Sequence, residues 1–166
     1  MNWFIFLSVI LVLLFQEGQS CLKRRSTDDV CECSDFLDLA ASMFQRNNVL
    51  FSEGSGCVRN VTCGAHYFTY LTTRFNVSEI SAPDDMSKNS NRADLQTVEL
   101  EGNSSAPTGP PLDLFSFFGL DCENSKWYAT KYPAGLEYVD INGELKYLGG
   151  GGEFNGKKSE IMKFAW

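Results

Sequence analysis

Six cysteines, all of them after residue 20, limit what this 166-residue chain can fold into more than any other feature. They are Cys21, Cys31, Cys33, Cys57, Cys63 and Cys122. An even number of cysteines in a secreted chain is typical of a disulfide framework, whose connectivity the count alone leaves open.

The spacing of the cysteines narrows the choice of partners. Cys31 and Cys33 are separated by one residue, and a bond between them would be strained, so we expect each to bond elsewhere. The set that we favour joins Cys31 or Cys33 to Cys57, Cys63 to Cys122, and Cys21 to whichever of the first pair remains.

The N-terminal residues predict the compartment. Residues 3–15 are apolar except for Ser8, and two small residues, Gly18 and Ser20, stand where a signal peptidase requires them. We therefore expect a signal peptide over residues 1–20, cleaved before Cys21. The alternative, a transmembrane anchor, needs a longer apolar run to cross a hydrocarbon core of about 30 Å. The product is expected to be secreted and extracellular, without a membrane anchor.

After removal of the signal peptide we expect one domain in which acidic residues outnumber basic residues. Residues 21–30 form a polar N-terminal arm, and residues 31–166 form a single cysteine-rich β domain. Loss of Glu17 leaves 20 acidic against 14 basic residues, a net charge of −6. At this charge we expect neither nucleic acid nor an anionic membrane surface as a partner.

Three N-glycosylation motifs fit the same compartment, with acceptors at Asn60, Asn76 and Asn103. The first lies in the β-forming run over residues 56–64. If that run is one strand, Val61 lies on the face of Cys57 and Cys63, whereas Asn60 lies on the opposite face. This alternation predicts sulfur atoms inside the domain and sugar outside it.

The pattern as a whole predicts a mostly β fold, an antiparallel sheet or sandwich braced by disulfides, with one short N-terminal helix. Ser34 is the expected N-cap of a helix over residues 34–46, since acidic residues follow it and apolar residues recur at helical spacing. Residues 49–51 are expected to form an edge strand, residues 65–75 a strand in mid-sheet, and residues 95–100 a short strand.

The C-terminal third predicts a β-meander. Residues 114–120 and 126–132 are interpreted as strands on either side of Cys122, with Trp127 close to a disulfide. A hairpin over residues 136–148 turns at Asn142-Gly143, and a two-residue loop there would pair Tyr138 with Tyr147. Residues 159–166 are expected to form the last strand.

The cysteine motifs resemble a known family. The segments Cys31-Glu32-Cys33, Gly56-Cys57, Val61-Thr62-Cys63 and Leu120-Asp121-Cys122, followed by Trp127, are similar to nematode secreted six-cysteine domains of unknown function. Members of that family have two residues between the first two cysteines and a final cysteine near the C-terminus, for which Cys21 is the substitute here. The resemblance implies an extracellular β-rich module with no catalytic residues to transfer.

Side chains suited to catalysis are few. His66 is the single histidine, and a metal site beside it would need thiolates that an oxidising compartment removes. The acidic pair Asp84 and Asp85 lacks the spacing of a calcium loop, so solvated carboxylates are the better interpretation. We expect no catalytic, cofactor-binding or metal-binding residues, and no cofactor.

These observations favour a non-enzymatic module that binds an unknown extracellular protein or carbohydrate. A secreted hydrolase and a structural component of the extracellular matrix are the alternatives. Tyr128, Tyr132 and Trp166 have the chemistry to stack on sugars, although such aromatic residues more often pack inside a fold.

Overall fold

The computed structural model describes residues 30–40, 49–54, 56–63, 69–97 and 112–165. Several predictions lie outside these residues, namely the signal peptide, most of the 21–30 arm, Cys21, His66, Asn103 and Trp166. Within the described part no helix is long and apolar enough to cross a membrane.

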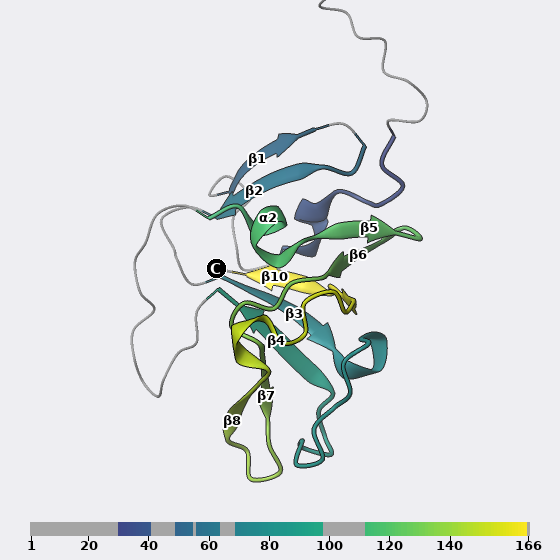
Figure 1. Ribbon diagram of the computed structural model, residues 1–166. Coiled ribbons are helices and arrows are strands. Elements are labelled where there is room, and N and C mark those ends of the chain that lie inside the picture. The colour runs from purple at the N-terminus through teal and green to yellow at the C-terminus, as the bar shows by residue number, and fades with distance from the viewer. Residues whose placement is uncertain (1–29, 41–48, 55, 64–68, 98–111, 166) are drawn as a thin grey trace, which may run out of the picture.

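The described residues form three antiparallel sheets around one apolar core, which confirms the expected mostly β class (Figure 1). The largest sheet has the strand order β10-β3-β4-β7-β8. Its strands are β3 (Tyr70–Arg74), β4 (Arg92–Gln96), β7 (Leu136–Val139), β8 (Leu145–Leu148) and β10 (Lys163–Ala165). The expected mid-sheet position of the 65–75 run holds for β3, which lies between β10 and β4.

Two smaller sheets and a few short helices complete the fold. The three-stranded sheet contains β5 (Asp121–Glu123), β6 (Lys126–Ala129) and β9 (Ser159–Glu160), and the hairpin contains β1 (Val49–Glu53) and β2 (Arg59–Cys63). The described helices are α2 (Leu114–Phe118) and the 3-10 helices η3 (Phe36–Leu39), η5 (Phe75–Val77) and η6 (Gly150–Gly152). Strand β1 confirms the expected edge strand.

The predicted last strand is in fact two strands in two different sheets. Ile161 donates its backbone N–H to the carbonyl of Trp127, 2.8 Å away, whereas the next residue, Met162, donates to the carbonyl of Thr72 at 2.8 Å. The chain therefore changes its hydrogen-bonding partner from β6 to β3 within two residues, and this change couples the two sheets.

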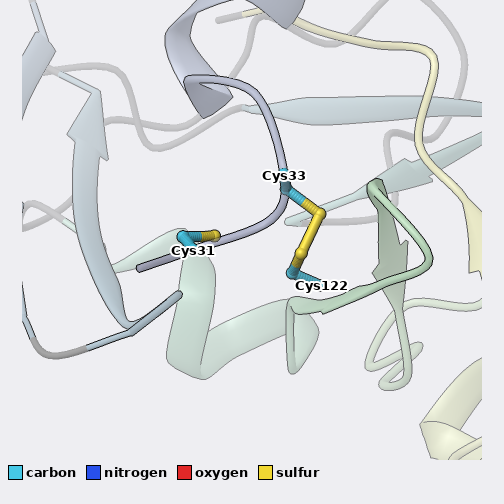
Figure 2. A group of neighbouring side chains, drawn as sticks. All are labelled: Cys31, Cys33 and Cys122. Carbon is cyan, nitrogen blue, oxygen red and sulfur yellow. A yellow bond between two sulfur atoms is a disulfide. The ribbon is translucent and has the colours of Figure 1, made fainter. Parts of the chain in front are cut away.

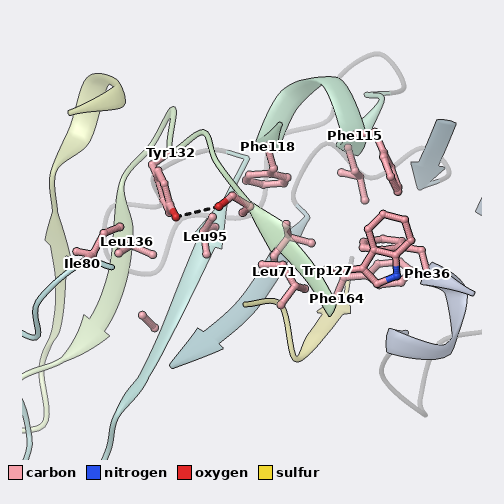
Figure 3. Close-up of a cluster of buried hydrophobic side chains, with 14 of the residues drawn as sticks. Phe36, Leu71, Ile80, Leu95, Phe115, Phe118, Trp127, Tyr132, Leu136 and Phe164 are labelled. Atoms are coloured by element: carbon pink, nitrogen blue, oxygen red, sulfur yellow. Dashed lines mark hydrogen bonds between the residues drawn. The ribbon is translucent and has the colours of Figure 1, made fainter. Parts of the chain in front are cut away.

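Aromatic side chains occupy the centre of the core (Figure 3). The ring of Phe36 stacks on Phe164 with centroids 5.0 Å apart, and it meets Phe115 and Trp127 edge-on at 5.0 and 5.6 Å. Edge-on and stacked ring pairs at such distances are favourable beyond the area that they bury. Phe36 therefore joins the N-terminal segment to three other parts of the chain.

Tyr132 is also a core residue, so it is not one of the sugar-stacking side chains considered above. Its ring is fully buried, and its hydroxyl lies 2.8 Å from the hydroxyl of Ser159 (Figure 3). Burial raises the pKa of Tyr132 to about 12, because the phenolate would lose its hydration.

The N-terminal helix is corrected by the structure. The described residues after Cys33 form only the 3-10 helix η3, and its N-cap is Asp35, whose carboxylate accepts a hydrogen bond from the N–H of Leu37 at 3.0 Å. Ala40 already forms a β-bridge with Phe164. This bridge ends the helical conformation one turn after it begins.

The predicted strand over residues 114–120 is wrong, because this segment contains helix α2. The carboxylate of Asp113 accepts hydrogen bonds from the N–H groups of Phe115 and Ser116, both at 3.2 Å. Gly119 ends the helix at a φ of 57°, in the left-handed region that glycine tolerates. Capping at both ends outweighs the β-propensity of the phenylalanines between them.

The hairpin over residues 136–148 is confirmed, but its register is shifted by one residue. Tyr138 pairs with Lys146, and Tyr147 pairs with Glu137. The carboxylate of Asp140 accepts hydrogen bonds from the N–H groups of Asn142 and Glu144 at 2.8 and 2.9 Å. These bonds, with Gly143 at a φ of 83°, build a three-residue loop in place of the expected two-residue loop.

Among the described residues, two disulfides connect the N-terminal segment to the rest of the domain, and Figure 2 shows the one between Cys33 and Cys122. Cys31 bonds Cys57, which agrees with one alternative of the expected set. Cys33 bonds Cys122, so two expected links are wrong, the one from Cys63 to Cys122 and the one from Cys21 to the remaining Cys33. The reason is local, since η3 places Phe36 against Trp127, and Cys122 is the strand partner of Trp127. Trp127 therefore lies beside a disulfide, as predicted.

Candidate binding face

The five-stranded sheet has one buried face and one polar face. On β3, Leu71 and Thr73 point into the core and are 0% and 1% exposed, whereas Arg74 is exposed. Side chains alternate along a strand, so Tyr70 and Thr72 share the face of Arg74. We call this side of the sheet the polar face.

Strand pairing brings residues from three strands together on the polar face. Arg92 of β4 lies opposite Arg74, and Asp94 of β4 lies opposite Thr72. Lys163 of β10 lies opposite Thr72 on its other side. Because opposed residues of an antiparallel pair point to the same face, the three basic side chains share the polar face, and Arg74 is a neighbour of both Arg92 and Lys163.

A groove of about 550 Å³ lies among these side chains. We call it the basic groove, and its walls include Tyr70, Thr72, Arg74, Asn91, Arg92 and Lys163. A smaller depression of about 250 Å³ adjoins it at Ser90 and Arg92 and continues across Glu137 and Val139 of β7. The polar face is therefore hollowed across several strands.

One basic residue of the groove is held in place by an acidic neighbour. A guanidinium nitrogen of Arg92 lies 2.8 Å from a carboxylate oxygen of Asp94, and its Nε donates to the other oxygen at 3.1 Å. The hydroxyl of Thr72 also donates to Asp94, at 2.6 Å. The hydrogen bond with Asp94 raises the pKa of Arg92 above its ordinary value. Arg92 therefore stays charged in a fixed position.

The other two basic residues differ from Arg92. Among the carboxylates that the structure describes, none forms an ion pair with Arg74 or Lys163. Both side chains are exposed, and none of the described residues that line the groove carries a carboxylate side chain. The groove is thus locally positive, although the whole chain carries a net charge of −7.

Two of the three predicted glycosylation acceptors lie on the described surface. Asn60 and Asn76 are both exposed, and Asn60 is next to the buried Val61 on β2, as the alternation predicts. The side-chain oxygen of Asn76 accepts a hydrogen bond from Asn91 at 3.1 Å. An N-linked sugar attaches to the nitrogen of the acceptor amide, so this contact is compatible with a glycan on Asn76 beside the groove.

The remaining candidates lie outside the groove. Tyr128 is half buried and lines a separate depression with Asn76 and Lys158. Asp84 and Asp85 are exposed, and Asp85 accepts a hydrogen bond from the Tyr138 hydroxyl at 2.9 Å.

The sulfur atoms of Cys31, Cys33 and Cys122 lie within 4.8 Å of one another (Figure 2). Such a group of thiolates could hold a metal ion. All three are bonded in disulfides, however, and a disulfide sulfur offers no thiolate. Their grouping therefore follows from two disulfides lying side by side.

A family model described as TRA-1 regulated protein R03H10.4 matches residues 29–166 of the chain. The chain belongs to this family. It is a C. elegans protein family of unknown function, which agrees with the nematode resemblance of the cysteine motifs. No curated protein and no solved structure matches the chain. The match to the TRA-1 regulated family includes both disulfides and the basic groove.

The basic groove was not predicted from the sequence. Its main residues come from β3, β4 and β10, which are far apart in the chain. The available signal is the alternation of buried and polar residues along 70–74 and 92–96. That signal identifies a polar face on each strand, but only the strand pairing shows that Arg74, Arg92 and Lys163 share it.

Proposed function

We propose that this chain is a secreted, N-glycosylated and non-enzymatic module that binds an extracellular ligand on the polar face of its five-stranded sheet. The single observation that carries this proposal is the basic groove. It is a concave, polar and locally charged site on regular strands, where side chains are held more firmly than on loops.

The disulfides support the extracellular part of the proposal. Disulfides persist in oxidising compartments and are rare in the cytosol. Cys33–Cys122 joins residues 89 positions apart, so this one disulfide closes a loop that contains more than half of the chain. The exposed acceptors Asn60 and Asn76 are accessible to the glycosylation enzymes of the same route.

A sugar placed on the rim of the groove tests the proposed binding site. Asn89 and Ser90 precede Asn91, so the single change Asn91→Thr completes an acceptor motif at Asn89. Asn89 is exposed and lines the groove. The added glycan would cover the groove without removing any of its basic residues. Asn91→Ala is the matched control, since it removes the same amide and adds no glycan.

The wild-type protein and both variants would be produced in a secreting insect cell line. Each would be tested on an array of neutral and acidic polysaccharides and of matrix proteins such as collagen and laminin. We expect wild type to bind one component, and Asn91→Ala to keep much of that binding because it loses only one amide of the groove. Glycosylated Asn91→Thr is expected to bind that component far more weakly than Asn91→Ala does. If glycosylated Asn91→Thr bound that component as tightly as Asn91→Ala, the result would contradict the proposed site. Retention of wild type inside the cells would contradict the proposed secretion.

A further inference from the structure

We infer that the ligand of the basic groove is an anionic polysaccharide that carries sulfate or carboxylate groups. This inference rests on the proposed function and narrows it to one chemical class of ligand. Its starting point is the charge of the groove, where Arg92 is paired with Asp94 but Arg74 and Lys163 pair with no described carboxylate, within a chain of net charge −7.

The strand register places two of these cations against each other. Arg74 and Arg92 are direct cross-strand partners on β3 and β4, and like charges in such positions are destabilising. Asp94 is bound to Arg92 and Thr72, and no described carboxylate pairs with Arg74. Asp94 already offsets the charge of Arg92, so the unmatched charge of the pair is that of Arg74. An anion bound beside Arg74 would supply this charge with a partner, so the site favours a negative ligand.

The third cation extends the site along the sheet. Lys163 is opposite Thr72, two residues from Arg74 on β3, so these two charges are diagonal neighbours roughly 7–8 Å apart at the backbone. A ligand with one negative group would satisfy only part of this arrangement. A polymer with repeated negative groups matches cations that are spaced over two adjacent strand pairs.

The neutral part of the groove favours a sugar over an acidic peptide. The hydroxyl of Thr72 and the amides of Asn89 and Asn91 are suited to sugar hydroxyls, and Tyr70 provides an aromatic ring. A peptide that binds a sheet usually adds a strand to its edge and places alternate side chains in pockets. The basic groove lies over the face of the sheet, between strands that are already paired.

Heparin is the probe for the sulfated class. Hyaluronate tests carboxylate groups alone, fully desulfated and N-acetylated heparin tests the loss of sulfate, dextran is the neutral polysaccharide, and polyglutamate is the acidic peptide. The test variant is Arg74→Gln/Lys163→Gln. The control is Lys131→Gln/Lys157→Gln, which removes the same charge from two exposed lysines that do not line the groove.

We expect wild type and the control to bind heparin or hyaluronate, and the test variant to bind about tenfold or more weakly at physiological salt. The slope of log affinity against log salt should fall by roughly two, one for each lost contact with the polyanion. Thermal unfolding of each variant shows whether the fold is intact.

The inference is overturned if neither heparin nor hyaluronate binds, and two results would overturn it even if one of them does. In one, the test variant and the control bind the polysaccharide equally. In the other, polyglutamate binds as tightly as heparin and is equally sensitive to Arg74→Gln/Lys163→Gln, which identifies an acidic peptide as the ligand class. If glycosylated Asn91→Thr blocks a neutral or protein ligand and heparin does not bind, the anionic class is wrong but the proposed face stands. If the added glycan blocks nothing, the face itself is wrong.

Discussion

The Cys33–Cys122 disulfide should contribute more to stability than Cys31–Cys57, because it closes the longer loop. The bonded residues are 89 positions apart in the first case and 26 in the second. In the chain-entropy model these separations correspond to about 4.5 and about 3.5 kcal/mol of stabilisation. The larger figure is a substantial part of the free energy of unfolding of a small domain, which is typically about 5–15 kcal/mol.

The perturbation is the paired replacement Cys33→Ala/Cys122→Ala, with Cys31→Ala/Cys57→Ala as its matched control. Urea unfolding followed by circular dichroism gives the free energy of unfolding of each protein. We expect the first pair to lower it by about 1 kcal/mol more than the second. Cys33 is also buried, 9% exposed, so loss of its packing acts in the same direction.

The reasoning would be refuted if the two replacements were equally destabilising or if their order were reversed. It would also be refuted if Cys33→Ala/Cys122→Ala lowered the free energy of unfolding by less than about 1 kcal/mol. Such a result would mean that the denatured chain is not the state that the disulfide constrains.

Three further predictions follow from local contacts. Asp113→Ala should lower the free energy of unfolding by about 1–2 kcal/mol in urea, because helix α2 loses its N-cap, and Asp113→Asn should lower it less. The pKa of Tyr132, raised to about 12, means that folding favours the neutral phenol. The contribution of Tyr132 to stability should thus be constant below pH 10 and be lost as the pH rises toward 12, and in urea titrations Tyr132→Phe should reduce the fall in stability over that range. Non-reducing peptide mapping should find Cys21 bonded to Cys63, since the other four cysteines are paired; a free thiol at Cys63 would contradict this.

The class of the fold was predictable because alternation and turn residues are local signals. The hairpin at Asn142-Gly143 and the edge strand at 49–51 required no knowledge of distant contacts. The register of the hairpin was missed, because the side chain of Asp140 binds the loop backbone and adds a residue to the turn. A glycine at a turn therefore identifies the hairpin but not its loop length.

Other features depended on contacts that the sequence does not show. The phenylalanines of residues 114–118 favour a strand, and only the caps Asp113 and Gly119 indicate a helix. The pairing of Cys33 with Cys122 follows from the packing of Phe36 against Trp127. The basic groove likewise exists only after β10, β3 and β4 have paired.

The most direct test of the proposed binding face is a titration of isotope-labelled protein with heparin oligosaccharide, followed by backbone amide chemical shifts. The account predicts the largest shifts at Tyr70–Arg74, Arg92 and Lys163. Shifts of similar size confined to the turn at Asn142-Gly143, or saturable binding that leaves the groove residues unshifted, would contradict it.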